Sequence, residues 1–522
     1  MKKLAFTISV FIFLVGNIFA QDLRKKAEEH PLDCAFYLLT KDKNSVDTDN
    51  LARMFFEVER YDDAIRVIDF DDNSYSRFLN LTDFSKKLIE KNKSDEANKF
   101  LTKAFSVLRD DEDWYTSGNM PLFVSSLVEM NRSAEAFEII EHQDEDAIKV
   151  KLFIALGETY SKLNQKENAI KFLKQAFQIR ESAEDHYISF KIVQIYIKFQ
   201  ENDEALAVLK QIESDILQSG KTHNLIQLIP FYLQLGKQEK AESIWQIYGD
   251  LTDPYDIFSY STFLINSGNT ERAKPYLSAL QNNQEYLNRS GNDLVEISLK
   301  LNDVETAVKI AKIMSSADDN YYQQEALMLV ADRFTTQGNN DEALKFLDFA
   351  YQKARKVGEE HRGEDSIGAS PLTRKIIYLR QIRERLFNLK RFDRGLAVVN
   401  SLKIRDDHFQ EFYAQSLVEF TKRQIKTLPR KTIYKLLDQA QKIFDEDEDY
   451  NRMKIGIAVA DIYAQMNEKP KAVEKLAEVL AEAEDYRTDD FLLAAGKIFE
   501  LNKLNTNANL RKVLKKFIAD AE

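Results

Sequence analysis

The stretch from Leu156 to Ala176, LGETYSKLNQKENAIKFLKQA, decides the fold of this chain of 522 residues. Gly157 and Tyr160 stand twelve and nine residues before Ala169, and Leu173 stands four residues after it. Ala169 and Leu173 fall on one stripe of an amphipathic helix. A small residue at Gly157 lets a preceding helix come close, and Tyr160 fills the space beside Ala169. The stretch therefore predicts two helices joined by a short turn.

The same pattern recurs along the chain at intervals of 32 to 39 residues. We take the small residue equivalent to Ala169 as the anchor of each copy. In every copy the residue four positions after the anchor is apolar, so each copy predicts a helical hairpin that must stack on its neighbours. The anchors are Ala64, Ala97, Ala136, Ala169, Ala205, Ala241, Ala273, Ala307 and Ala343, followed by the weaker copies Gly395, Ile433 and Ala472.

These residues resemble the tetratricopeptide repeat (TPR), whose signature has Leu-Gly, Tyr, Ala, Phe and Ala at the spacing of Leu156-Gly157, Tyr160, Ala169, Leu173 and Ala176. The resemblance covers residues 45–350 and, more loosely, 373–500. Copies around Ala97, Ala136 and Ala307 lack the full small–aromatic pair, and the Pro after the second helix is missing. The resemblance implies an all-α, right-handed α-solenoid of about twelve to thirteen TPR-like helix-turn-helix repeats.

The family binds its ligands on the concave surface, through residues about 11 and 15 positions before each anchor. In this chain the resemblance implies that the following residues face a protein or peptide partner: Phe190, Gln194, Phe258, Thr262, Asn292, Glu296, Met328 and Asp332. No Lys stands fifteen residues before the anchors from Ala64 to Ala343, so the family's clamp for chaperone C-terminal carboxylates is not expected.

Composition agrees with a helical array. The chain has only 15 Gly and 8 Pro, too few for the turns of a large β-sandwich, whereas 34 Phe and 22 Tyr supply a core. The net charge of −12 disfavours nucleic acid or an anionic membrane surface as partner. The single cysteine, Cys34, stands among apolar residues and is expected to be buried.

Residues 1–20 have the order of a secretory signal peptide. Lys2 and Lys3 precede an apolar run from Leu4 to Val15, and the small residue Ala20 marks a cleavage site. The alternative is an uncleaved anchor, but the run is short and interrupted by polar residues. We therefore expect export to the periplasm, or alternatively to the medium, with a mature net charge of −14 once Lys2 and Lys3 are removed.

The repeat is interrupted once, at residues 358–371, which are rich in Gly and predict a loop between a solenoid of residues 21–357 and a second one of 372–522. Residues 351–400 hold 12 Lys and Arg against 6 Asp and Glu. The basic segment 372–394 is either a solvated helix face or a docking site for an acidic protein or anionic glycan. Arg383 lies nearest the buried stripe and is expected to be structural; the outward-facing candidates are Arg374, Tyr378 and Arg385.

The last pair of helices, from residues 491 to 521, is expected to form a solvent-facing end cap, because its second helix carries a run of exposed cations, 511–516. Catalytic motifs are not found. Gly363 and Gly368 have phosphate-loop spacing without the required Lys, the six His are scattered, and the acidic run 445–449 fails as a calcium loop. We expect no cofactor, metal or nucleophile.

The sequence therefore predicts a non-catalytic scaffold or adaptor of the cell envelope that binds a partner on its concave surface. Two alternatives stay open. One is an architectural component of an envelope or secretion complex, and the other is an accessory subunit of envelope polysaccharide metabolism.

Overall fold

The computed structural model describes residues 21–110, 119–179, 186–220, 222–248, 253–266, 268–314, 321–356, 371–401, 407–443, 449–483 and 488–522. The expected signal peptide lies outside these residues, and so does the expected loop except for Pro371, which begins a helix. The described secondary structure is helical throughout, without strands. Each described helix is either too short or too polar to cross a membrane.

Contacts between residues divide the chain into two units. Unit 1 contains residues 1–248 and 463–522, and unit 2 contains residues 249–462. The predicted loop falls within the range of unit 2. The proposed division of the solenoid at that loop stays a prediction.

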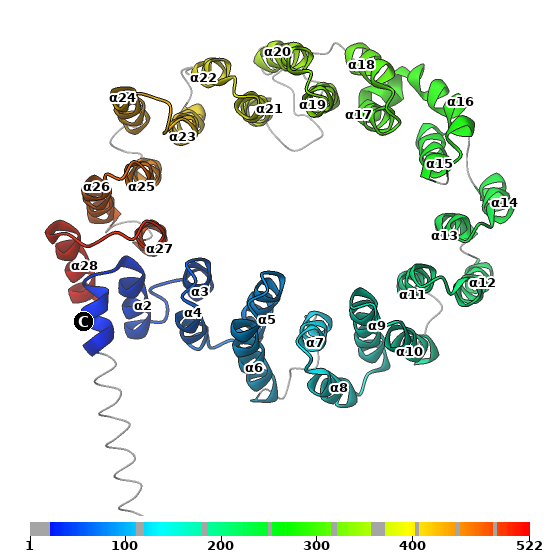
Figure 1. Ribbon diagram of the computed structural model, residues 1–522, viewed down its shortest axis with the longest axis horizontal. Coiled ribbons are helices and arrows are strands. Elements are labelled where there is room, and N and C mark those ends of the chain that lie inside the picture. The colour runs from blue at the N-terminus through cyan, green and yellow to red at the C-terminus, as the bar shows by residue number, and fades with distance from the viewer. Residues whose placement is uncertain are drawn as a thin grey trace, which may run out of the picture. The chain divides into compact units, whose positions relative to one another are not determined.

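Unit 1 begins with α2 (Pro31–Lys41), which is followed by antiparallel pairs (Figure 1). These are α3 (Thr48–Glu57) with α4 (Tyr61–Ile68), α5 (Ser74–Glu90) with α6 (Ser94–Asp110), α7 (Met120–Glu129) with α8 (Ser133–Glu141), α9 (Asp146–Lys162) with α10 (Lys166–Ile179), and α11 (His186–Lys198) with α12 (Asn202–Ser219). The 3-10 helix η2 (Thr222–Leu228) continues into α13 (Ile229–Gln234), which pairs with α14 (Gln238–Tyr248). The unit is completed by α26 (Lys469–Glu482), α27 (Thr488–Leu501) and α28 (Ala508–Ala521).

Unit 2 repeats the same hairpin. Its pairs are α15 (Pro254–Asn266) with α16 (Thr270–Gln281), α17 (Gln284–Lys300) with α18 (Val304–Ile313), α19 (Tyr321–Thr336) with α20 (Asn340–Lys356), α21 (Pro371–Asn388) with α22 (Phe392–Asn400), and α23 (Asp407–Arg423) with α24 (Arg430–Gln441), followed by α25 (Asp449–Gln465). The first helices form one layer, on the inner side of this unit's curve, and the second helices form the other (Figure 1). The structure confirms an α-solenoid of TPR-like hairpins.

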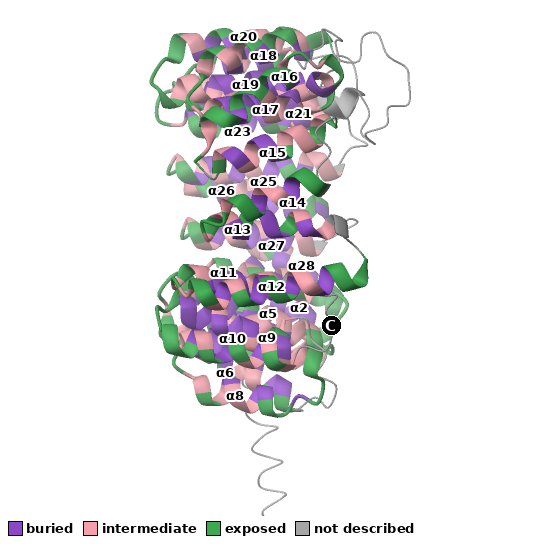
Figure 2. Ribbon diagram, turned by 90° about the vertical axis from the view of Figure 1, so that its right-hand side faces the viewer, coloured by how far each residue is buried: buried purple, intermediate pink, exposed green. Residues whose placement is uncertain are grey.

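Every predicted anchor is the fourth residue of a second helix, from Ala64 in α4 to Ala472 in α26. The alanine anchors have no exposed surface at all, and Ile433 is 1% exposed. Figure 2 shows the buried segments alternating with exposed ones along the helices, as expected where each helix buries one stripe. In the pair α9–α10, a Cβ added to Gly157 would lie 2.8 Å from Leu173 Cδ2 and 3.3 Å from the carbonyl oxygen of Ala169. The close approach predicted at Ala169 is confirmed.

A common turn joins the two helices of a pair. The residue five positions before the anchor adopts a left-handed conformation, such as Asn164 (φ 57°) before Ala169. The next N–H, that of Gln165, then donates to the carbonyl oxygen of Tyr160 at 2.8 Å, which completes a Schellman motif. Copies that lack the full sequence signature, at Ala97, Ala136 and Ala307, have the same turn. In the pair α23–α24, by contrast, α24 begins behind Pro429.

The two ends of unit 1 lie against each other. Helix α2 contacts both α27 and α28, and a Cβ added to Gly496 in α27 would lie only 2.4 Å from Leu32 Cγ. Arg511 pairs with Glu29 at 2.8 Å, and Lys515 pairs with Glu28 at 3.3 Å. The expectation of a solvent-facing end cap therefore does not hold, because α2 covers this pair of helices and residues beside α2 neutralise two of its cations.

Cys34 on α2 is completely buried, as predicted. Burial raises the pKa of its thiol far above the usual range, and nearby Asp33 adds to this shift. A thiol in this state is a packing group without nucleophilic character.

Candidate functional site

The predicted site residues are divided between the two units. Phe190 and Gln194 lie on α11 in unit 1, where the half-buried ring of Phe190 stacks on Phe231 with centroids 5.0 Å apart and Gln194 is exposed. The others lie on first helices of unit 2: Phe258 and Thr262 on α15, Asn292 and Glu296 on α17, Met328 and Asp332 on α19, and Arg374, Tyr378 and Arg385 on α21.

Two of these residues are not available to a partner. Met328 is 3% exposed and Tyr378 is 1% exposed, although both were expected on the binding surface. A first helix in this array is covered from more than one side: α21, for example, contacts α19, α20 and α22. A helix packed in this way buries more than the single stripe on which the expectation rested. The side chain of Arg374 lies outside the described part of the structure.

Arg385 and Asp332 form one ion pair. The guanidinium of Arg385 donates from Nε and Nη2 to the two carboxylate oxygens of Asp332, both at 2.8 Å. The two residues come from neighbouring first helices, α21 and α19, and were predicted as separate partner-binding positions. In this geometry each neutralises the other, so neither presents a free charge.

Other arginines of the basic segment are also paired. Arg383 is 2% exposed and lies 2.6 Å from carboxylates of both Glu384 and Glu419, which confirms the prediction that it is structural. Arg394 pairs with Asp348 of α20 at 2.9 Å. Three arginines of α21 and α22 are therefore neutralised within unit 2.

An acidic face lies on α17 and α19 instead. Asn292 on α17 donates from Nδ2 to Glu325 Oε2 on α19 at 2.9 Å. Asp293 follows Asn292, and Glu296 lies one turn further along α17, where it pairs with Lys300 at 2.8 Å. Asp293 and Glu325 have no cationic partner among the residues that the structure describes.

The pKa values of these carboxyl groups reflect that lack of compensation. Partial burial raises the pKa of Asp293, and the charge of Glu296 adds to the shift. The pKa of Glu325 is also raised, first by burial and then by Asp293 and Glu296, while the hydrogen bond from Asn292 acts in the opposite direction. Like charges held close together without a counter-ion destabilise the folded state at neutral pH.

Buried polar atoms near this face lack hydrogen-bond partners. Tyr286 on α17 is only 2% exposed, and its hydroxyl has no partner even though it lies close enough to Asp293 for that carboxylate to raise its pKa. Asn292 Oδ1 and, on α15, Thr262 Oγ1 are also buried without a partner. Unsatisfied buried polar atoms are uncommon in folded proteins and call for an explanation.

Aromatic rings border the acidic face. Tyr255 of α15 meets Tyr286 edge to face with centroids 5.4 Å apart, and Phe258 lies 6.0 Å from the same ring. Carboxylates beside aromatic rings bind ammonium and guanidinium groups, through charge and through cation–π attraction.

The sequence analysis found part of this face and missed the rest. It selected Phe258, Asn292 and Glu296 but not Asp293, Glu325 or the two tyrosines. Glu325 stands eighteen residues before its anchor Ala343, one helical turn before the position that was examined. Including the residues eighteen positions before each anchor would have found Glu325. The proximity of Asp293 and Glu325 could not be found in this way, because it depends on how the two helices stack.

The acidic face has the chemistry of a binding site for a cationic side chain. Among the described residues, no three His, Cys, Asp or Glu side chains come together in a way that could hold a metal ion. The acidic face combines two carboxylates, an amide oxygen and a hydroxyl beside aromatic rings. A lysine or arginine side chain can pair with the two half-buried carboxylates, since an ammonium has three donors and a guanidinium has five.

Comparison with known proteins identifies the type of repeat. The model of the family "Tetratricopeptide repeat" matches residues 150–182, which span the turn and most of the pair α9–α10. The match covers one helical hairpin of the chain. No curated protein sequence matches the chain.

Several solved structures are similar to the chain at low sequence identity. The crystal structure of the APC/C hetero-tetramer Cut9-Hcn1 is 15% identical over 85% of this chain and 95% of that chain, with a TM-score of 0.25. The crystal structure of the yeast Tom70 is 12% identical over 89% of this chain and 97% of that chain, with a TM-score of 0.25. Ton1535 from Thermococcus onnurineus NA1 is 12% identical over 79% of this chain and 98% of that chain, with a TM-score of 0.24.

Proposed function

We propose that this chain is a non-catalytic scaffold that binds a basic segment of a partner protein on the acidic face of α15, α17 and α19. The observation that carries the proposal is the pair Asp293 and Glu325, two carboxylates with raised pKa values and no cationic partner among the described residues. A lysine or arginine side chain between them would relieve their repulsion.

The scaffold is proposed to act in the cell envelope after export. The support is the order of residues 1–20, in which two lysines precede an apolar run and Ala20. Mass spectrometry of the protein from its native cells should find Gln21 as the first residue. A membrane-bound protein that retains Met1 would contradict export with cleavage.

A peptide-binding experiment tests the acidic face. The double variant Asp293→Asn, Glu325→Gln removes both charges and keeps the shape of both side chains. Binding of a fluorescein-labelled peptide of lysine and alanine, followed by anisotropy, should weaken about tenfold, since each lost pair involves a charge-assisted hydrogen bond. The matched control Glu271→Gln, Glu305→Gln alters exposed carboxylates on α16 and α18 and should bind as the wild type does.

The same variant separates a binding role from a structural one. Both pKa values are raised in the folded state, so the charged carboxylates lower stability at neutral pH. The double variant should therefore unfold at the same or higher denaturant concentration while it binds less tightly. Equal binding by the wild type and the double variant would overturn the proposal, and a clear loss of stability would show that the carboxylates are structural.

A further inference from the structure

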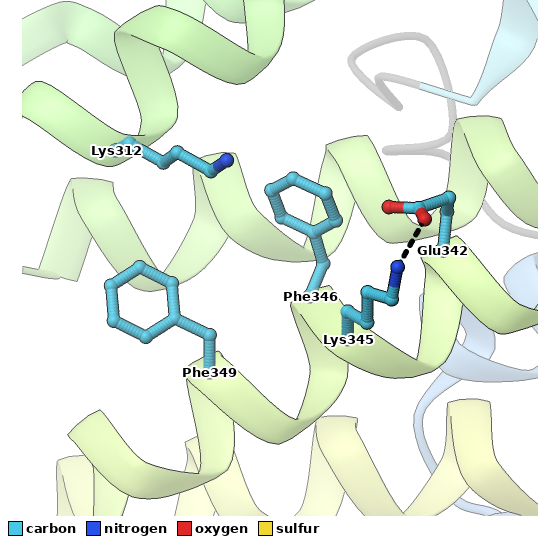
Figure 3. Close-up of a pocket in the computed structure, with 5 residues that line it drawn as sticks. All are labelled: Lys312, Glu342, Lys345, Phe346 and Phe349. Atoms are coloured by element: carbon cyan, nitrogen blue, oxygen red, sulfur yellow. Dashed lines mark hydrogen bonds and ion pairs between the residues drawn. The ribbon is translucent and has the colours of Figure 1, made fainter.

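A pocket of about 390 Å³ opens on the other layer of unit 2, between the second helices α18 and α20 (Figure 3). Lys312 of α18 lines one side, and Glu342, Lys345, Phe346 and Phe349 of α20 line the other. The two phenylalanine rings and the chain of Lys312 surround the open space in Figure 3. Its volume is within the range of pockets that take a ligand or a large side chain.

Apolar side chains stand at the same register in both helices of the pocket. Six residues after the anchor, seven of the twelve copies carry a polar side chain, and five carry an apolar one: Phe70, Ile247, Ala279, Ile313 and Phe349. In α18 and α20 this position is Ile313, which is 43% exposed, and the half-buried Phe349. Phe346 forms a rigid wall, because it is 5% exposed and stacks on Phe334 with centroids 5.6 Å apart. The adjacent second helices α18 and α20 therefore both present an apolar side chain at this position.

The charges around this apolar surface are uncompensated cations. Lys312 Nζ lies 5.5 Å from the ring centroid of Phe346, and Lys353 Nζ lies 6.0 Å from that of Phe349. Neither lysine has a carboxylate partner within the part of the chain that the structure describes. The one carboxylate of the pocket, Glu342, is held by Lys345 at 2.5 Å. The pocket is thus apolar at its walls and positive at its edge.

We propose that this pocket binds an acidic segment of a partner protein through one large apolar side chain. The apolar side chain enters between Phe346, Phe349 and the methylene chain of Lys312, and flanking aspartate or glutamate residues pair with Lys312 and Lys353. The pocket attracts an acidic segment, whereas the acidic face attracts a basic one. The inference therefore stands independently of the proposed function, on a different layer of the unit.

Anisotropy with a labelled peptide of aspartate and glutamate around one tryptophan tests the pocket on the full mature chain. Charge reversal by Lys312→Glu, Lys353→Glu should weaken binding about tenfold or more. The difference in affinity between this variant and the wild type should decrease as salt is added. The matched control Lys431→Glu, Lys435→Glu makes the same change of charge on α24, another second helix of unit 2, and should leave binding unchanged. The variant Asp293→Asn, Glu325→Gln should also bind this peptide normally.

The apolar contribution is tested separately. Replacement of the tryptophan of the peptide by alanine should weaken binding about tenfold, and so should the substitution Phe349→Ala in the protein. Melting followed by circular dichroism checks that the Phe349→Ala protein is folded. Equal binding of peptides with and without tryptophan would reduce the site to general attraction between opposite charges and would overturn the proposal. Absence of binding to the wild type, or equal binding by the Lys312→Glu, Lys353→Glu variant, would overturn it as well.

Discussion

Ala169 shows at the residue scale how this solenoid is held together. It has no exposed surface, and its carbonyl oxygen and the side chain of Leu173 lie against Gly157 of α9. Every copy of the repeat places its anchor in the same register, at the fourth residue of the second helix. In the pair α9–α10 a short side chain is a geometric requirement, because a longer one would push the two helices apart. Ile433 occupies the same position in the pair α23–α24, which has a different turn.

Replacement of Ala169 by leucine should therefore destabilise the protein by about 1–3 kcal/mol through overpacking. The neighbouring control, Glu167→Leu, adds an apolar side chain of similar size at an exposed position of the same helix and should have a much smaller effect. Urea unfolding followed by circular dichroism measures both. If the two variants had equal midpoints, the close approach at Ala169 would be refuted.

The arginines of α21 show how far single residues could be interpreted in advance. Arg383 was predicted to be structural because it falls beside the apolar stripe, and it is buried against Glu384 and Glu419. The pairing of Arg385 with Asp332 could not be predicted, because the two residues are 53 positions apart and meet only when α19 and α21 stack. Helical periodicity describes one helix and contains no information on which helix lies beside it.

At the scale of the element, the turn between paired helices is as regular as the anchor. Asn92, Asn131, Asn164, Asn302 and Asn467 occupy the left-handed position, and Gly236, Gly268 and Gly338 occupy it in other copies. These residue types tolerate positive φ values better than the others do. The sequence already contained this signal, five residues before the anchor, but the analysis of apolar stripes alone did not use it.

Gly338, with φ 76°, should be sensitive to substitution for this reason. Space is not limiting, since nothing lies within 4 Å of an added Cβ. Gly338→Ala should nevertheless cost about 1 kcal/mol, because an L-residue is strained in the left-handed region. The control Gln337→Ala changes the exposed residue before it. Thermal and urea midpoints would show the difference, and a Gly338→Ala protein as stable as the wild type would mean that this turn is not left-handed.

At the scale of the whole molecule, the contact between the chain's first and last helices is the feature that sequence reasoning could least anticipate. The repeat pattern predicted every hairpin from Ala64 to Ala472, since each depends on neighbours in the sequence. The contact of α2 with α27 depends on residues more than 460 positions apart, such as Leu32 and Gly496. The cations of α28 were interpreted as exposed for the same reason, because their partners Glu28 and Glu29 lie at the other end of the chain.

His30 lies at the centre of this contact and makes it sensitive to pH. Its Nδ1 accepts a hydrogen bond from the N–H of Leu32 at 3.1 Å, which caps α2, and its ring meets Phe499 edge to face at 4.8 Å. Burial lowers the pKa of His30 below the ordinary value of 6.5. The charges of Asp33 and Glu500 act in the opposite direction, and Arg60 acts with burial. Burial outweighs the two carboxylates, so the folded state holds this imidazole neutral.

A lowered pKa means that the folded state binds fewer protons than the unfolded state, so stability falls as the pH drops through 6.5 towards the folded pKa. Protonation also removes the lone pair with which Nδ1 caps α2. We expect hydrogen-exchange protection of the α2 amides to decrease between about pH 7.5 and about pH 5 relative to the variant His30→Asn, which keeps a capping side chain and does not titrate. The control His142→Asn removes an exposed histidine at the C-terminal end of α8. Its α2 amides should lose protection over the same pH range as those of the wild type. Parallel loss of protection in the wild type and in His30→Asn would show that His30 does not make this contact sensitive to pH. A gain of protection by the wild type on acidification would show that the carboxylates of Asp33 and Glu500 outweigh burial, so that the pKa of His30 is raised.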